Sequence, residues 1–459
     1  MDNATTVLAS QAQSLTEAAK VFLDKTPKQW LPYAVGLLVG YPLLTNALRY
    51  RRLRKLHKKY PYPTRESLAQ MTDDEAYAIQ KELGELEFPM VYLKSLQFAL
   101  FRVPNHLNPS LSSPSPSARN RIKANNTPSR KTYGIPSISH VLTKTSQFSN
   151  PETSLKRYTD TSALIQEMMA HNPTSHRAFV SLARTRFLHS GYRSSGRILE
   201  SDMLYTLALF ALQPVRFVSK YEWRELSDLE RCAIGTFWKS IGDALGISFE
   251  ELPSGKTGFK DGIQWLEEVD AWSEVYEQKY MVPDQKNRET ADQTTDVLLY
   301  MLPKALHPLG LQFVSFMMDD RLRKAMLYEP PSPFAAAVFD GLFKVRKFVL
   351  RYLMLPRPYF LRLISITPEP DANDRYFLTS WEAAPYYVKP TFWNRWGPTA
   401  WFTWMMGRPV PGDEGDKYRP EGYHIANIGP RYFEGKGQKE VEKLMEEMKV
   451  YRTGKCPFH

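Results

Sequence analysis

The sequence predicts an all-α protein in which one amino-terminal transmembrane helix precedes a globular helical domain with an irregular, aromatic carboxyl-terminal part. Residues 30–48 are apolar and uncharged, long segments beyond residue 150 place apolar residues three and four apart, and alternating strand patterns are scarce. The chain has 459 residues and 43% hydrophobic content, enough for the core of one large or two ordinary domains. We therefore expect a globular protein with an added membrane anchor.

Residues 30–48 are predicted to cross a membrane as a single helix. Their length is close to the roughly 20 residues that span a hydrocarbon core, and Trp30 marks one interface. Gly36, Gly40 and Pro42 are tolerated inside membranes more readily than in soluble helices. A buried core helix is the alternative. A cleaved signal peptide is disfavoured, because acidic residues precede this late segment and no small-residue cleavage site follows it.

The charge around this segment predicts how the anchor is oriented. The basic run 49–59 on its carboxyl side should face the cytosol, which leaves the amino-terminal arm in the lumen. Asn3, in the sequence Asn-Ala-Thr, is then a glycosylation site, whereas Asn125, in Asn-Asn-Thr, is cytosolic and unmodified. Two cysteines, Cys232 and Cys456, agree with a reducing compartment for the bulk of the chain.

The net charge of +11 would ordinarily suggest nucleic acid as a partner, but its distribution favours a membrane surface. The basic excess lies in residues 49–59 and in residues 103–131, which contain no acidic residue, and neither belongs to a recognisable nucleic-acid-binding fold. Residues 103–131 are rich in Ser, Pro and Asn with few large apolar residues, so they are expected to form a disordered insert.

Apolar periodicity predicts the helices of the folded part. They are expected at residues 73–85, 90–101, 161–169, 175–189, 201–217, 227–245, 259–280, 296–302, 311–327, 333–355 and 439–451. Ser201 and Ser227 are expected to cap helix starts, and Gly191 and Gly246 to mark helix ends. The helix 333–355 is expected to pack on the core rather than to lie in a membrane interface.

Several familiar chemistries lack their motifs. Gly255-Lys-Thr257 has no preceding phosphate-loop glycine, and neither a G-x-S-x-G elbow nor a G-x-G-x-x-G turn occurs. Glu421 and His424 form the only Glu-x-x-His pair, whereas a di-iron bundle needs two. Neither cysteine lies in a loop of the type that cytochromes P450 use to bind haem. Histidine-ligated haem remains as a candidate.

Arg157, Thr161 and His189 form the candidate haem site. Arg157 and Thr161 are four residues apart on one predicted helix face, and His189 ends the next predicted helix. A neutral imidazole can ligate haem iron, a guanidinium can pair with a propionate or polarise dioxygen, and a hydroxyl can add a directional hydrogen bond. The alternatives are a capping or core histidine, a surface arginine and a helix-start threonine.

Other residues near these motifs have two open interpretations. Arg184 and Arg186 can hold propionates or form a solvated or membrane-facing basic face, and the second interpretation is favoured. His307 can line the pocket or begin a helix. Four aromatic residues can line the pocket or belong to the ordinary core, namely Phe187, Phe210, Trp238 and Trp265.

The motifs also carry a family resemblance. They read Tyr-Gly-Ile-Pro136, Arg157-Tyr-Thr-Asp-Thr161, Leu188-His-Ser-Gly-Tyr192, Gly235-Thr-Phe-Trp238, Leu306-His-Pro-Leu-Gly310 and Pro420-Glu-Gly-Tyr-His424. The chain resembles the MpaB-type oxygenases of the endoplasmic reticulum (ER) in fungal meroterpenoid pathways and, more distantly, the latex-clearing rubber oxygenases. The resemblance implies a helical domain that binds haem b, with His189 as the proximal iron ligand and with Arg157 and Thr161 beside the haem.

The resemblance further implies a membrane-anchored oxygenase of secondary-metabolite biosynthesis. It would use haem-bound dioxygen to cleave a carbon–carbon double bond in a hydrophobic substrate, such as a prenyl side chain, and other pathway enzymes are possible partners. The implied organisation is a luminal arm at 1–29, the transmembrane helix at 30–48, a basic juxtamembrane and helical lead-in at 49–102, the insert at 103–131 and a catalytic domain at 132–459.

Two features depart from the family pattern. Asp160 stands where the rubber oxygenases place a distal lysine, and no residue matches their catalytic carboxylate base. Relative to the fungal enzymes, residues 103–131 are an additional loop or translated intron sequence. Two other functions stay open: a haem-free enzyme of the same fold that uses Asp160 or another carboxylate in acid–base chemistry, and a non-catalytic membrane-tethered partner of other enzymes.

Overall fold

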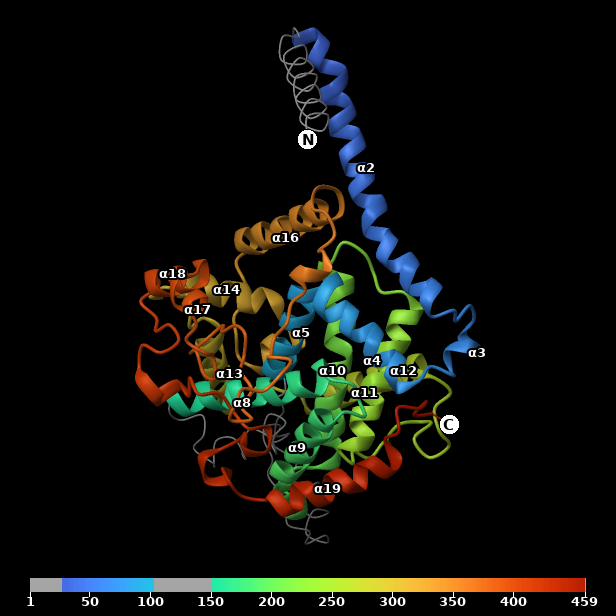
Figure 1. The fold of residues 1–459 in the computed structure, drawn as a ribbon, viewed down its shortest axis with the longest axis vertical. Helices are drawn as coiled ribbons and strands as arrows, with labels where there is room; N and C mark the ends of the chain where they lie inside the picture. Colours follow the sequence, from blue (N-terminus) through green and yellow to red (C-terminus); the bar gives the residue numbers. More distant parts are fainter. Residues whose placement is uncertain (1–26, 103–150, 459) are drawn as a thin grey trace, which may run out of the picture. The chain divides into compact units, whose positions relative to one another are not determined.

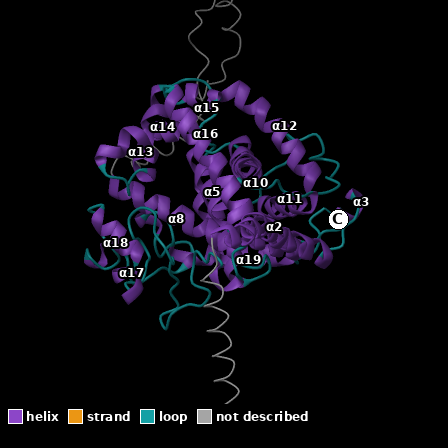
Figure 2. Cartoon of the chain, turned by 90° about the horizontal axis from the view of Figure 1, so that it is seen from above, coloured by secondary structure: helices purple, strands orange, loops and turns teal. Residues whose placement is uncertain are grey.

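The computed structural model describes residues 27–102 and 151–458. The expectations for Asn3, Asn125, the luminal arm, the insert 103–131 and the start of the catalytic domain lie largely or wholly outside these residues. Within them helices dominate and no strand forms, the only extended pairings being three isolated bridges (Figure 2). The all-α prediction is therefore confirmed.

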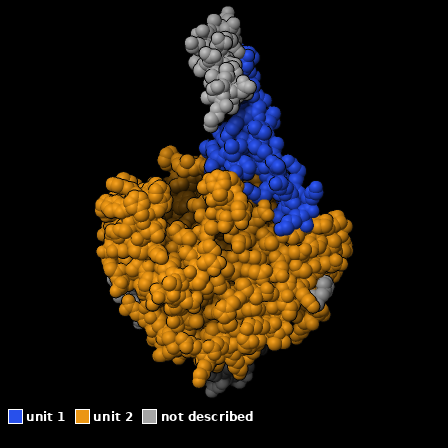
Figure 3. Space-filling model, viewed as in Figure 1, with its two compact units in different colours: residues 1–59, 344–356 blue, residues 60–343, 357–459 orange. Residues whose placement is uncertain are grey.

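The chain divides into two compact units, residues 1–59 with 344–356 and residues 60–343 with 357–459 (Figure 3). In the first unit, α2 (Pro27–Lys59) contains a candidate membrane span in which only 6% of the most apolar window is buried. Tyr41 donates to the carbonyl of Leu353 (2.9 Å) and Arg49 Nε donates to that of Met354 (2.8 Å), so η4 (Val349–Leu353) packs along α2. The exposure of α2 favours an anchor over a buried core helix.

The second unit is a helical domain packed around α10 (Glu200–Tyr221), which is buried along most of its length (Figure 1). Three helices pack directly on α10, namely α5 (Pro89–Arg102), α11 (Asp228–Ala244) and α12 (Gly262–Tyr280). The other helices before residue 330 are α3 (Arg65–Leu68), α4 (Asp73–Glu82), η1 (Leu83–Glu87), α13 (Gln285–Leu298), η3 (Lys304–Leu306), α14 (His307–Met317) and α15 (Asp320–Ala325).

The helix pair that carries the candidate site is α8 (Pro151–Ala170) and α9 (His176–Ser194). A short connection joins the two helices, and the Ser175 hydroxyl caps α9 by accepting the N–H of Ala178 (3.3 Å). α13 packs on α8, and α19 (Gln438–Tyr451) packs on α9. Segments from three distant parts of the sequence therefore meet at this pair.

Several helix ends differ from the sequence expectation. α9 continues through Gly191 to Ser194, so Gly191 is not a stop. Ser201 lies inside α10, whose first turn is closed by the Asp202 carboxylate accepting the N–H of Leu199 (3.2 Å). Ser227 is confirmed as the cap of α11, where it forms a capping box with Glu230.

Two expected helices are also placed differently. α13 begins well before residue 296, and the expected helix 311–327 is divided into α14 and α15. The expected helix 333–355 consists of α16 (Pro333–Phe348) followed by η4. Ala335 and Phe339 are the buried residues of α16, so the core-packing expectation holds for only one narrow face.

The carboxyl-terminal part is irregular, as expected. Its short helices are η5 (Tyr359–Leu361), α17 (Phe392–Trp396), α18 (Pro398–Met405), η6 (Gly415–Tyr418), η7 (Ile425–Asn427) and η8 (Arg431–Phe433). The segment that contains η7 and η8 packs on α9 and closes one side of the candidate site.

Candidate functional site

A cavity of about 330 Å³ lies within the second unit, a volume typical of small-molecule sites. Its walls come from α8, α9, α10, α11, α13 and the segment 429–433. Apolar side chains form most of the lining, among them Leu164, Ile165, Met168, Met203, Leu207, Phe210, Trp238, Ile241, Leu245 and Val297. The polar side chains on α8, α9 and η8 are Arg157, Thr161, Thr185, His189, Tyr192 and Tyr432, and α10 and α13 add the hydroxyls of Thr206, Thr290 and Thr294. The cavity is thus apolar with a cationic and hydroxyl-rich region.

All three residues of the predicted trio line this cavity. Arg157 and Thr161 follow one another on successive turns of α8, and His189 lies near the end of α9. The i, i+4 spacing places the first two on one helix face, and the packing of α8 on α9 brings His189 to the same space. The structure therefore brings together the residues singled out from the sequence.

His189 has the electronic state and the free atom that a metal ligand needs. Burial, together with the nearby charges of Arg157 and Arg193, lowers the pKa of His189 to about 4, so the imidazole is neutral at pH 7. Its Nδ1 is buried without a hydrogen-bond partner in the described part of the chain. A buried nitrogen left without a partner costs roughly 1–3 kcal/mol, and a bound group would remove this cost. His189 therefore fits a haem iron ligand.

Arg157 and two tyrosines form the polar region of the cavity. Burial lowers the pKa of Arg157 to about 10, so the guanidinium keeps its positive charge at neutral pH. The hydroxyls of Tyr192 and Tyr432 are 3.0 Å apart, and burial raises the pKa of Tyr432 to about 12. A guanidinium beside two hydroxyls suits a carboxylate such as a haem propionate or the oxygen atoms of a substrate.

Asp160 also borders the cavity, but both of its carboxylate oxygens are engaged by protein groups. Lys156 Nζ lies 2.7 Å from Oδ2, and the Tyr387 hydroxyl donates to Oδ1 at 2.7 Å. Burial raises the pKa of Asp160 above its ordinary value, and Lys156 and Tyr387 oppose this shift. Lys156 also donates to the carbonyl of Gly429 (2.8 Å), so this group fastens the cavity wall to α8.

Comparison with known proteins identifies the family. The family described as "ER-bound oxygenase mpaB/B'/Rubber oxygenase, catalytic domain" matches residues 135–348. The chain is 64% identical to the ER-bound oxygenase mpaB' of Penicillium brevicompactum over 446 residues, which cover 97% of this chain and 98% of the relative. The chain belongs to the MpaB/rubber oxygenase family. Its members are named oxygenases, and this chain is accordingly an enzyme of the oxidoreductase class.

Two further relatives carry the same description. The chain is 56% identical to the ER-bound oxygenase mpaB of Penicillium brevicompactum over 409 residues, covering 89% of this chain and 90% of the relative. It is 62% identical to the ER-bound oxygenase mpaB of Penicillium roqueforti over 328 residues, covering 72% of this chain and 99% of the relative. The similarity to members of the MpaB/rubber oxygenase family thus extends well beyond residues 135–348.

In this MpaB-family chain, Arg184 has a role that the sequence did not suggest. Its side chain is fully buried and donates to the carbonyls of Ile428 (2.9 Å), Phe433 (2.9 Å) and Lys436 (2.8 Å). The expectation of a solvated or membrane-facing basic face is wrong for this residue, because its side chain is fully buried against backbone carbonyls. Arg184 instead holds the segment that forms one wall of the cavity.

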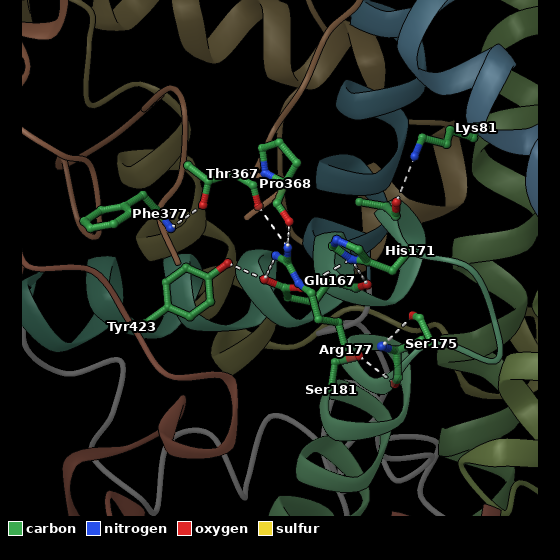
Figure 4. Close-up of polar contacts among 12 residues, drawn as sticks. Lys81, Glu167, His171, Ser175, Arg177, Ser181, Thr367, Pro368, Phe377 and Tyr423 are labelled. Carbon is green, nitrogen blue, oxygen red and sulfur yellow. Dashed lines mark hydrogen bonds and ion pairs between the residues drawn. The ribbon is translucent and has the colours of Figure 1, made fainter. Parts of the chain in front are cut away.

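A second buried network fastens the α8–α9 pair to the carboxyl-terminal part (Figure 4). Arg177 Nε and Nη2 pair with the two carboxylate oxygens of Glu167 at 3.0 and 2.8 Å, and the Tyr423 hydroxyl donates to the same carboxylate at 2.7 Å. Arg177 also donates to the carbonyls of Thr367 and Pro368. These groups lie outside the cavity lining, and their role is to position α8 and α9.

Of the other residues considered from the sequence, only some line the cavity. Phe210 and Trp238 line the cavity as a stacked pair with ring centroids 5.6 Å apart, whereas Phe187 and Trp265 are absent from its lining. His307 begins α14, where Nε2 lies 3.1 Å from the Leu302 carbonyl, and it does not reach the cavity. Glu421 and His424 border a separate surface depression. Within the described ranges, no group of three or more histidine, cysteine or acidic residues is arranged to hold a metal ion.

Proposed function

We propose that this oxygenase binds haem b through His189 and cleaves a carbon–carbon double bond in a hydrophobic substrate. The observation that carries the proposal is His189 itself, a neutral imidazole with an unpartnered ring nitrogen at the wall of an apolar cavity. When bound, the haem iron would supply the activation of dioxygen that no amino-acid side chain provides. The products expected from such a cleavage are two carbonyl compounds.

The side chains around His189 have distinct roles in this proposal. Arg157 would pair with a haem propionate or with the oxygen atoms near the iron, since it stays cationic inside the cavity. Thr161 would add a hydroxyl hydrogen bond on the same helix face. Asp160 is a poor candidate for a proton-transfer base, because Lys156 and Tyr387 already occupy both of its oxygens.

The apolar wall of the cavity suits a hydrophobic substrate, such as one with a prenyl or other unsaturated side chain. The stacked rings of Phe210 and Trp238 face the cavity together with aliphatic side chains of α8, α10 and α11. Such a lining binds a hydrocarbon chain by excluding water and leaves the polar region around Arg157 and Tyr192 for oxygen-bearing groups.

The relatives are named ER-bound, and we propose that α2 anchors this chain in the same membrane as a single-pass helix. The basic run 49–59 would place the second unit, which includes most of the proposed catalytic domain 132–459, in the cytosol. A peptide-N-glycosidase shift on the full chain tests this topology, because Asn3 would be modified and Asn125 would not. A shift that persists in Asn3→Gln and disappears in Asn125→Gln would reverse the orientation.

The absorption spectrum of the detergent-purified protein, expressed with haem supplementation, tests the proposed cofactor. Wild type is expected to show a Soret band that changes on reduction with dithionite and again with carbon monoxide, and His189→Ala is expected to lose or shift it. His307→Ala is the matched control, since His307 lies outside the cavity. Absence of haem from both wild type and His189→Ala would overturn the proposal and direct attention to a haem-free function or to a non-catalytic partner role.

A further inference from the structure

The second unit exposes an unusual concentration of aromatic side chains on two consecutive short helices. On α17 and α18 the exposed fractions are 75% for Phe392, 69% for Trp393, 50% for Trp396, 58% for Trp401, 56% for Trp404 and 71% for Met405. Four of the ten tryptophans of the chain lie on these two helices in contact with solvent. Clustered exposed apolar groups of this kind mark an interaction site.

These side chains form one continuous feature, here named the aromatic surface. The ring centroids of Trp396 and Trp404 are 6.3 Å apart, and those of Trp401 and Trp404 are 5.8 Å apart. Figures 1 and 2 show α17 and α18 side by side at the edge of the second unit. Thr403 and Ala400 are the buried residues of α18, so the small side chains face the protein and the large ones face outward.

α14 carries exposed apolar side chains of its own. The Arg408 guanidinium lies 4.3 Å from the ring centroid of Tyr300, which ties the end of α18 to the turn preceding α14. On α14, Leu309 is 54% exposed and Phe313 is 38% exposed.

The charge of these segments selects the kind of partner. No acidic residue occurs between positions 383 and 412, whereas Lys389, Arg395 and Arg408 do. In residues 297–318, around α14, Lys304 is the only residue with a formal charge when histidine is neutral. Arg395 is paired with Asp413, but Lys389 and Lys304 are exposed. A basic, acid-free border around tryptophans is complementary to anionic lipid headgroups.

We propose that the aromatic surface lies in the headgroup region of a phospholipid bilayer and gives the oxygenase unit a membrane contact of its own, separate from α2. Tryptophan prefers the membrane–water interface, and α17 and α18 are too short to span a hydrocarbon core. The chain also contains a candidate membrane span, so a bilayer is the partner available to it. The contact would hold the second unit on the membrane from which a hydrophobic substrate is drawn.

Fluorescence quenching by brominated lipids tests this contact in the full chain. The protein is reconstituted in phosphatidylcholine vesicles containing a minority of phosphatidylserine, with or without bromine on the acyl chains near the headgroup. A Trp30→Phe background removes the tryptophan of the anchor helix. The tryptophan emission is expected to be quenched by the brominated lipid. The quadruple variant, in which Trp393, Trp396, Trp401 and Trp404 are all replaced by phenylalanine, is expected to lose most of that quenching.

The phenylalanine substitutions keep the surface apolar, so they remove the reporters without removing the contact. Trp272→Phe is the matched control, because Trp272 lies on α12 and stacks on Tyr276 at 4.8 Å; it should leave the quenching unchanged. Equal emission in brominated and ordinary lipid would overturn the proposal. Unchanged quenching in the quadruple variant would do the same. Cross-linking of two chains through Trp401→Cys without lipid quenching would also overturn it and would assign the surface to a second copy.

Discussion

Lys156 and Asp160 lie one turn apart on α8 and form a buried ion pair with an Nζ–Oδ2 distance of 2.7 Å. Their side chains are 8% and 7% exposed. Arg157 and Thr161 directly follow them in the sequence, so one face of α8 is fastened to the carboxyl-terminal segment while the adjacent face borders the cavity. The aspartate that departs from the rubber-oxygenase pattern thus belongs to the support of the site.

Removing one member of this pair should destabilise the protein strongly. Asp160→Ala removes the nearer of the two carboxylates that pair with the buried Lys156 ammonium, the other being Glu434 with Oε1 at 3.3 Å. It also takes away the acceptor of the Tyr387 hydroxyl, and together these losses should cost roughly 2–4 kcal/mol of unfolding free energy. Denaturant unfolding of the detergent-solubilised protein measures the loss. Replacing both residues with apolar side chains, Lys156→Met with Asp160→Leu, should recover much of the stability because no unpaired charge remains.

The exposed pair Lys449–Glu446 provides the control for this experiment. Its side chains are 44% and 69% exposed, so Glu446→Ala should change the unfolding free energy by less than about 1 kcal/mol. A similar small change for Asp160→Ala would show that the α8 pair is screened by solvent and does not support the cavity wall.

Two helical glycines should respond to alanine in opposite directions. A Cβ at Gly235 of α11 would overlap the backbone carbonyl of Gly262, the first residue of α12. Gly235→Ala should therefore destabilise the protein by at least roughly 1–3 kcal/mol. A Cβ at Gly191 of α9 would meet no atom within 4 Å, and alanine there should stabilise the helix by roughly 0.5–1 kcal/mol. Thermal unfolding should show a lower melting temperature for Gly235→Ala and a higher one for Gly191→Ala. Destabilisation by Gly191→Ala would contradict the continuation of α9 to Ser194.

The parts of the molecule that sequence patterns predicted are those set by local spacing. The main helices follow from apolar periodicity, and Arg157, Thr161 and His189 were found because their arrangement depends on two neighbouring helices. α13 was placed too late because its sequence, QKNRETADQTTDVL, contains few apolar residues. The burial of Arg184 could not be predicted, since its partners at 428–436 are far away in the sequence and are backbone carbonyls without a residue-specific signal.

The stability of the protein should depend on pH through Asp202. This carboxylate accepts the Tyr276 hydroxyl at 2.9 Å and the Leu199 N–H, yet burial raises its pKa from 3.8 to about 7. A raised folded-state pKa means that the folded protein binds this proton more tightly than the unfolded chain does. The contribution to stability is therefore present below pH 4 and is lost as the pH rises from about 4 to 7.

Asp202→Asn isolates this contribution because it keeps the shape and removes the titration. The unfolding free energy of wild type minus that of Asp202→Asn should fall between pH 4 and pH 7, by an amount on the order of 1–4 kcal/mol. Asp228→Asn, at a carboxyl whose side chain is 75% exposed, controls for the loss of a negative charge on the surface. A free-energy difference that stays constant, or that rises with pH, would contradict a raised pKa of Asp202 in the folded protein.

Arg184 should control the order of the cavity wall. Arg184→Met removes the donors to three carbonyls in the segment 428–436 and leaves those carbonyls buried. Arg184→Lys retains the charge but lacks the planar guanidinium, so it cannot donate to all three carbonyls at once. Hydrogen exchange in residues 428–436 should accelerate in both variants, more in Arg184→Met. Under the proposed haem binding, the Soret band should broaden or weaken in the same order. Arg186→Met, on the same helix but only partly buried, is the matched control. Unchanged exchange in Arg184→Met would mean that the Lys156–Asp160 pair holds the wall without Arg184.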